Sequence, residues 1–221
     1  MNDASKFRAE ILTGQFHTAS VSDQQMIRSL FGEHTEQKFE LYFHWYNLIH
    51  ELGHAVMDFN APKRPHPAEE EQLVNDFATA FWNTYGEAEK FDRLSQVVLQ
   101  IQSRFPCPVT DGSDHVTYAK SIWGSERLMT FEIYGWFQFS CVAHSLANIR
   151  TLPEVLESMG ISVPGIPKGK MILCETEKEE PEKIIRKAVK ILKEAGLSLP
   201  QQIDVRLVED PNCHMLRTYP M

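Results

Sequence analysis

Apolar residues recur at intervals of three and four along most of this chain, which is the period of helices packed against a core. Four long helices are predicted, at about 36–59, 68–85, 87–104 and 118–150. Gly124 and Gly135 are candidate breaks in the last of these, because glycine is a poor helix former. Two shorter helices are predicted, at about 22–32 and 151–160. The pattern therefore indicates a mainly helical protein.

Strand signals lie near the two ends of the sequence. A weak one surrounds Ile11 and Phe16, and a short apolar run at 171–174 is typical of a strand. Pro181 and Gly196 bracket a helix, because proline suits the first helical position and glycine the position after the end. The segment 203–208 then alternates apolar and polar residues, as a half-buried strand does.

These signals predict an α+β fold. The main helical domain is expected to span residues 1–160, and residues 168–221 are expected to form a β-α-β unit. Such a unit either stands as a small second domain or completes a sheet in the first.

Net charge bears on possible partners. The chain has 221 residues and a formal charge of −8, so a nucleic-acid backbone is not an expected partner. One basic cluster interrupts this pattern, at Lys183, Arg186, Lys187, Lys190 and Lys193. It lies in a helical pattern among glutamates and is expected to be a solvated face.

No membrane or export signal is visible in the sequence. The first residues lack the apolar stretch of a secretory signal, and no apolar run approaches the length of about 18 residues that spans a bilayer. The four cysteines are widely spaced without a CxxC pair, which favours a reducing compartment. We expect a cytoplasmic protein with no membrane partner. Cys141 and His144 could share a helix face, and core packing is the preferred interpretation of Cys141.

The strongest chemical signal is the segment His50-Glu51-Leu52-Gly53-His54, an HExxH motif inside the helical pattern of 36–59. Histidines four residues apart lie one turn apart on the same helix face. Two imidazoles at that spacing can bind one zinc ion while the glutamate reaches the attacking water. The motif predicts His50 and His54 as zinc ligands and Glu51 as general base.

A catalytic zinc site needs a third protein ligand and an open position. The form HExxHxxGxxH is excluded, because Met57 and Asn60 occupy the positions of its glycine and third histidine. The gluzincin form instead takes a glutamate from a following helix. Residues 60–67 form a proline-rich turn, and the helix after it opens with Glu69-Glu70-Glu71. A short helical hairpin would bring that helix beside the first.

Glu71 is the preferred third ligand among these glutamates. An acidic first turn is also what the helix dipole favours, so the acidic run alone decides little. Asn75 lies one turn beyond Glu71 on the same face and can accept the outer N–H of a ligating histidine. Glu70 is expected to face partly away and stay solvated. His66 is a weaker alternative ligand.

The segment HELGHAV, followed by Glu71-Gln-Leu-Val-Asn75-Asp-Phe77-Ala78, resembles the ImmA/IrrE-type metallopeptidases. Their pattern is HExxH followed by a helix of the form ExxxNxFA. The resemblance implies a zincin-like fold, a Zn²⁺ cofactor and a protein or peptide substrate. It also implies zinc ligation by His50, His54 and Glu71.

Other roles stay open at this point. Such enzymes usually add a tyrosine or histidine that stabilises the oxyanion. The candidates here are Tyr134, His144, His115, Tyr118 and His214. Asp58 is a candidate outer partner of the site. The expected reaction is peptide-bond hydrolysis; the alternatives are a non-catalytic binding protein on the same fold and a hydrolase of a non-peptide bond.

Overall fold

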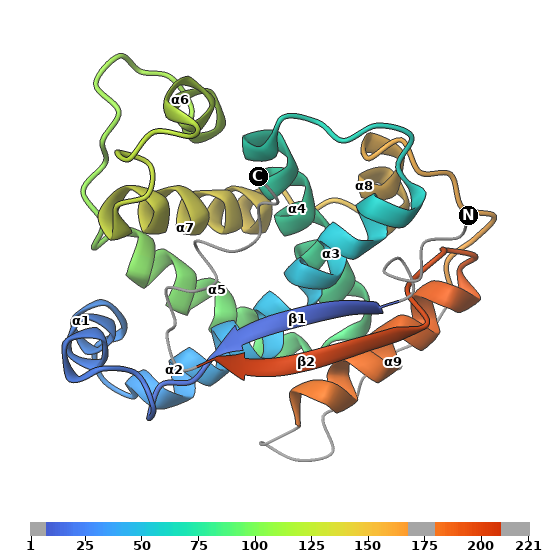
Figure 1. The fold of residues 1–221 in the computed structure, drawn as a ribbon, viewed down its shortest axis with the longest axis horizontal. Helices are drawn as coiled ribbons and strands as arrows, with labels where there is room; N and C mark the ends of the chain where they lie inside the picture. The colour runs from blue at the N-terminus through green and yellow to red at the C-terminus, as the bar shows by residue number, and fades with distance from the viewer. Residues whose placement is uncertain (1–7, 168–179, 209–221) are drawn as a thin grey trace.

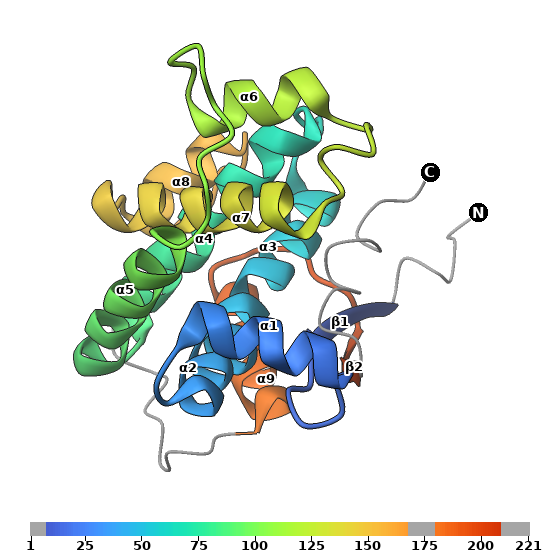
Figure 2. The same ribbon diagram turned by 90° about the vertical axis from the view of Figure 1, so that its left-hand side faces the viewer.

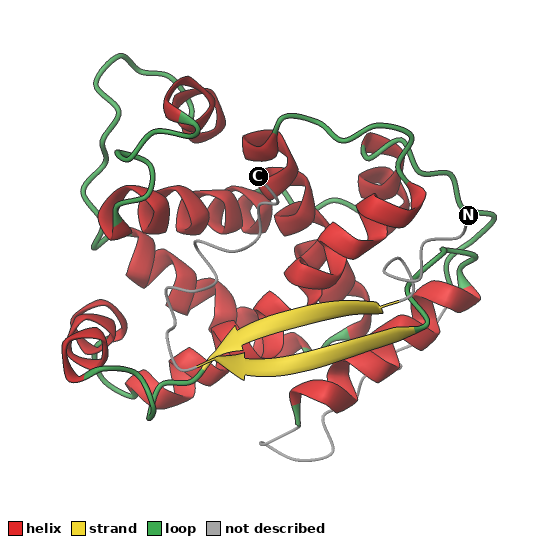
Figure 3. Ribbon diagram, in the orientation of Figure 1, coloured by secondary structure: helices red, strands yellow, loops and turns green. Residues whose placement is uncertain are grey.

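The computed structural model describes residues 8–167 and 180–208. They form an α+β structure that is mainly helical, with one two-stranded sheet (Figure 3). The elements are β1 Arg8–Gly14, α1 Val21–Phe31, α2 Thr35–Leu41, the π-helical segment η2 Tyr42–Tyr46, α3 Asn47–Asn60, α4 Pro67–Tyr85, α5 Ala88–Gln102, α6 His115–Ile122, α7 Phe131–Ala147, α8 Leu152–Ser158, α9 Pro181–Glu194 and β2 Gln202–Val208. The predicted predominance of helix is confirmed.

The sheet joins the two ends of the described chain. β1 and β2 run parallel, with Ile11 opposite Val205, and α9 lies along them (Figure 1). The strand at the end of the chain therefore pairs with the strand at its beginning, as one of the two sequence alternatives allowed. The strand expected at 171–174 lies outside the described residues, and the division into two domains stays a prediction.

The helix expected at 36–59 is a continuous helical run that changes its winding in the middle. α2 passes into η2 and then α3, and the Asn47 N–H donates to the Tyr42 carbonyl, five residues back. A π turn widens the helix and rotates the residues after it relative to those before it. The turn therefore sets the direction in which the face carrying His50 and His54 points.

The helix expected at 118–150 is broken once. Residues 123–130 separate α6 from α7, and Gly124 in this break has a φ of 78°. Gly135 does not interrupt α7. A Cβ there would lie 2.6 Å from the Phe105 ring, so this glycine allows close packing within an intact helix. Figure 2 shows α6 beside α7 at one end of the molecule and the sheet towards the other.

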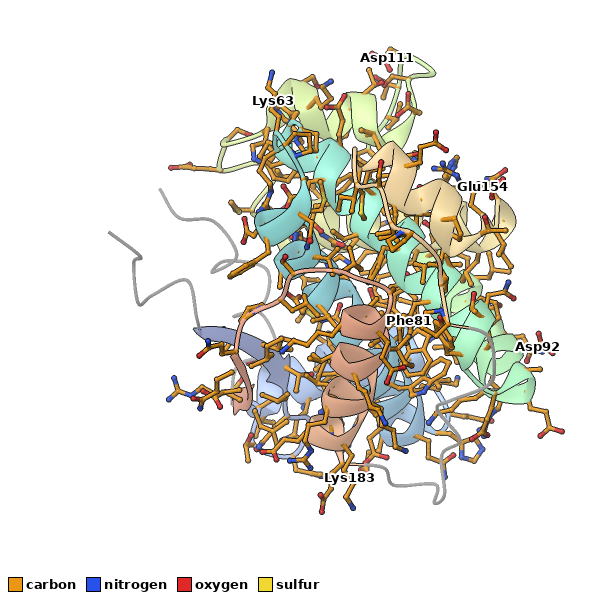
Figure 4. The ribbon with its side chains drawn as sticks, turned by 90° about the vertical axis from the view of Figure 1, so that its right-hand side faces the viewer. Lys63, Phe81, Asp92, Asp111, Glu154 and Lys183 are labelled. Carbon is orange, nitrogen blue, oxygen red and sulfur yellow. The ribbon has the colours of Figure 1, made fainter. Side chains whose placement is uncertain are left out.

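Helices α3 and α4 form the expected hairpin. His50 lies beside Asn75 and His54 beside Glu70, so the two helices run antiparallel. Gly53 allows them to approach closely, because a Cβ at that position would lie 3.1 Å from both Val74 and Phe77. Phe81 continues this packing into the core, whereas Lys63 and Asp111 lie at the periphery (Figure 4). The hairpin thus brings the HExxH face against the first turns of α4.

Candidate metal centre

The side chains of His50, His54 and Glu71 meet between α3 and α4. One potential ligand atom from each lies within 4.8 Å of the others. Glu71 Oε2 is 3.4 Å from His50 Nε2, and Glu71 Oε1 is 3.8 Å from His54 Nε2. The side chains are largely buried, at 6% exposed for His50, 16% for His54 and 2% for Glu71. The structure thus gathers the three residues that the sequence assigned to the metal.

His50 is held by the predicted outer partner. Its Nδ1–H donates to Asn75 Oδ1 over 3.1 Å, which leaves Nε2 facing Glu71. The Asn75 amide is itself fixed, because its Nδ2 donates to the Glu71 carbonyl over 2.8 Å and the Tyr46 hydroxyl donates to Oδ1. Asn75 therefore sets both the orientation and the tautomer of the His50 ring.

His54 is held by Glu70, a partner that the sequence interpretation missed. The His54 Nδ1–H donates to Glu70 Oε1 over 2.6 Å, and Arg64 donates to both oxygens of that carboxylate. Glu70 is only 6% exposed, so the expectation that it stays solvated is wrong. The antiparallel crossing places the first turn of α4 beside His54, and this turn presents two adjacent glutamates to α3.

The remaining candidates near the hairpin have other partners. Glu69 pairs with Lys120 over 2.7 Å. Asp58 pairs with Arg64 and so touches the site only through it. His66 is the N-cap of α4, where its Nδ1 accepts from the Ala68 N–H. These contacts leave Glu71 as the glutamate that faces both histidines.

Glu71 has an outer partner from a third helix. Gln138 of α7 donates from Nε2 to Glu71 Oε2 over 2.8 Å, and the same nitrogen lies 2.9 Å from the Tyr134 hydroxyl oxygen. Each of the three clustered side chains is thus oriented by one polar neighbour. Gln138 is separated from Glu71 by 67 residues, and no sequence spacing links them.

The cluster has an anionic character that attracts positive charge. Burial favours the neutral acid, but the interactions with His50 and His54 outweigh it and lower the pKa of Glu71 to about 2. Burial also opposes a charged imidazole, but the Glu70 hydrogen bond and the charges of Glu71 and Glu51 raise the pKa of His54 to about 9. A cation between these groups would therefore be stabilised.

One buried atom supports the fit of a metal ion directly. His54 Nε2 is buried and has no hydrogen-bond partner among the described residues, although buried ring nitrogens normally have one. It faces Glu71 in the cluster. Two imidazole nitrogens and a carboxylate oxygen are a donor set that catalytic zinc sites use. The residues present therefore fit a zinc ion.

Glu51 lies on the same helix, next to His50 in the sequence. Asn47 donates from Nδ2 to Glu51 Oε1 over 3.3 Å, and the Glu51 side chain is half-buried. Its negative charge is one of the causes that raise the pKa of His54 against the opposing effect of burial, after the Glu70 hydrogen bond and the charge of Glu71. Its placement fits a group that exchanges protons with a molecule bound at the cluster.

The structure separates the other candidate residues. Tyr134 is linked to Glu71 through Gln138, whereas His115 bonds to Gln72 on a different face of α4. His144 is exposed beside His115, and the buried Tyr118 packs against Trp136. His214 lies outside the described residues. Cys141 is fully buried, as expected for a core residue.

Three comparisons, with models of known protein families, with curated proteins and with solved structures, find no match for this chain. None of the described helices combines the length and the apolar character that crossing a membrane requires. The residues of the site are therefore what indicates a function for this protein.

Proposed function

We propose that this protein is a zinc-dependent peptidase with a zincin-like fold, similar to the ImmA/IrrE-type metallopeptidases. His50, His54 and Glu71 would hold the zinc ion, and Glu51 would act as general base. The observation that carries the proposal is the convergence of these three side chains, with His54 Nε2 buried and without a hydrogen bond to any residue that the structure describes. The substrate would be a protein or peptide of the cytoplasm.

The zinc ion would polarise the scissile carbonyl and make the attacking water acidic near neutral pH. Glu51 then accepts a proton from that water and later delivers it to the leaving amine. Asn75 and Glu70 accept from Nδ1 of the two imidazoles and so hold them in the tautomer whose Nε2 would be available to zinc. In this mechanism Glu51 moves the proton, whereas Asn75 and Glu70 orient the histidines.

Glu51 favours an enzyme over a non-catalytic binding protein. A purely structural metal site has four closed ligands and needs no additional carboxylate beside it. Here three candidate ligands converge, and the half-buried Glu51 lies near them without belonging to the set. A binding protein would tolerate its replacement, so this residue separates the two hypotheses.

The decisive experiment combines metal analysis with the Glu51→Gln substitution. The wild type should bind one zinc ion per chain and generate new N-termini in a cytoplasmic proteome. Glu51→Gln should keep the zinc and lose activity by about 10²- to 10⁴-fold, because the amide cannot accept a proton. Glu69→Gln is the matched control, since Glu69 pairs with Lys120. Near wild-type activity in Glu51→Gln would exclude the proposed mechanism.

A further inference from the structure

Helix α7 contributes two polar side chains next to the candidate metal centre, and the HExxH motif does not indicate them. Tyr134 and Gln138 lie one turn apart on α7, and α7 packs against α4. Gln138 reaches Glu71, and the Tyr134 side chain is only 4% exposed. The buried Tyr134 hydroxyl is thus connected to a candidate metal ligand through the Gln138 amide.

The Gln138 amide determines which way the Tyr134 hydroxyl donates. The end of the amide that faces the Glu71 carboxylate must be the NH₂ group, because a carboxylate only accepts. The same nitrogen faces the Tyr134 oxygen, so its second hydrogen is donated there. Tyr134 therefore accepts from Gln138, and its own hydroxyl hydrogen is available to another acceptor.

The protonation state suits a donor. Burial raises the pKa of Tyr134 well above its ordinary value, and the charges of Glu71 and Glu51 raise it further. The phenol is therefore neutral at physiological pH and keeps its hydrogen. The position of this hydroxyl follows from Gln138, whose nitrogen lies 2.9 Å from the Tyr134 oxygen and 2.8 Å from Glu71 Oε2.

Tyr42 is the rival donor among the described tyrosines. Its side chain is also buried, and Glu71 and Glu51 are among the causes that raise its pKa. Its ring stacks on Tyr46 and Phe139, whereas the Tyr134 hydroxyl shares the Gln138 amide nitrogen with the Glu71 carboxylate. The continuous hydrogen-bonded path to the ligand favours Tyr134.

We propose that Tyr134 stabilises the oxyanion formed during peptide hydrolysis by donating a hydrogen bond, and that Gln138 positions it relative to Glu71. This inference rests on the proposed peptidase function. Tyr134 transfers no proton, because stabilisation requires only its O–H directed at the oxygen on which negative charge develops. Gln138 acts through Tyr134 and Glu71 and touches no substrate.

The first test measures binding rather than turnover. Cobalt-substituted protein is titrated with acetohydroxamate, whose oxygen stands in for the oxyanion, and its visible absorption is followed. Tyr134→Phe should weaken acetohydroxamate binding by about tenfold or more, since it loses a hydrogen bond to a charged group. Binding of imidazole, which offers no oxygen, should be unchanged. Tyr118→Phe, which removes another buried hydroxyl, is the matched control.

The second test measures zinc affinity and peptide cleavage on the same variants. Tyr134→Phe should keep zinc affinity and lower kcat by about 10²- to 10³-fold with little change in KM. Gln138→Leu should lower both kcat and zinc affinity, the latter by about 10- to 100-fold, because Glu71 loses its partner. A split of this kind would not arise if the two residues only packed α7 against α4.

The outcomes separate this inference from the proposed function. An active wild type in which Tyr134→Phe keeps full kcat and acetohydroxamate affinity would overturn the role of Tyr134 alone. A loss in Tyr42→Phe in place of Tyr134→Phe would assign the donor to Tyr42 and overturn it equally. A wild type that binds zinc but cleaves nothing, or binds no zinc, would overturn the peptidase and this inference with it.

Discussion

Helix α4 carries two polar clusters on adjacent faces, and they differ in how completely they are satisfied. On one face Glu70, Glu71 and Asn75 meet the histidines of α3. On the other, Gln72 and Asp76 meet α6, α7 and Arg150. Residues 71 and 72 differ by one position, which turns the side chain by about 100° around the helix.

In the second cluster, Gln72, Asp76, Ser145 and His115 hydrogen-bond to one another. Gln72 donates from Nε2 to Asp76 and Ser145 over 2.8 and 2.9 Å, and the Ser145 hydroxyl donates to Asp76 over 2.6 Å. His115 Nε2 lies 2.7 Å from Oε1 of the same Gln72 side chain. Burial, followed by the charge of His144, lowers the pKa of His115, so its ring tends to stay neutral. This network needs no further ligand.

The opposite arrangement is found in the proposed metal cluster, which consists of the side chains of His50, His54 and Glu71. Its outer atoms are paired, through Asn75, Glu70 and Gln138, while its inner atoms face one another. His54 Nε2 has no hydrogen-bond partner there within residues 8–167 and 180–208. Among the described residues, one polar cluster of α4 is therefore satisfied throughout, whereas the other is satisfied at its periphery and open at its centre, as the proposed zinc site requires.

Glu71→Ala should break the metal cluster most severely. It removes one of three proposed ligands, so zinc affinity should fall by more than about 100-fold, beyond the usual effect of losing an outer partner. The measurement is competition with a chromophoric chelator. Glu69→Ala is the control, because the pair of Glu69 with Lys120 lies near the surface. Equal losses in the two variants would contradict the assignment of Glu71.

Glu70→Ala should have the next largest effect. His54 loses the acceptor of its Nδ1–H, and zinc affinity should fall by about 10- to 100-fold in the same competition assay. The control is Asp58→Ala, which removes an exposed partner of Arg64 and should change zinc affinity little. Zinc affinity in Glu70→Ala equal to that of the wild type would show that Glu70 only anchors Arg64.

Gly53→Val should disturb the geometry of the metal cluster without removing any of its groups. The added side chain crowds Val74 and Phe77, and overpacking of this kind costs about 1–3 kcal/mol. Displacement of α4 should lower zinc affinity by about tenfold, equivalent to about 1.4 kcal/mol. Calorimetric titration with zinc checks this, and Gly53→Ala should fall between the valine variant and the wild type. Unchanged affinity in the valine variant would show that α4 can shift without moving Glu71.

Ser145→Ala tests the second cluster, the network of Gln72, Asp76 and Ser145. It opens the closed network at one hydroxyl, so the free energy of unfolding should fall by about 1 kcal/mol. Urea denaturation of the metal-free protein measures this change. Zinc affinity should stay at the wild-type value, and a marked loss would mean that the two faces of α4 are coupled.

Local spacing allowed the sequence to indicate much of the site. His50 and His54 are four residues apart, which puts them on one face of their helix. Glu71 and Asn75 are also four residues apart, so they share one face of the next helix. The proline-rich turn ends one helix and starts the next, so the hairpin follows from residues close in the chain. The helical core could be predicted for the same reason, because the apolar period is a local property.

Tertiary packing decided what spacing could not. The roles of Glu70 and Gln138 depend on how α4 crosses α3 and how α7 packs on α4. The pairing of β1 with β2 joins segments from opposite ends of the described chain, and the sequence left that alternative open. The sequence suggested a helix break at Gly135, but the structure shows that this glycine makes room for the Phe105 ring within an intact helix. In each case the partner lies far away or across a helix crossing, and its side-chain direction is fixed only when the helices pack together.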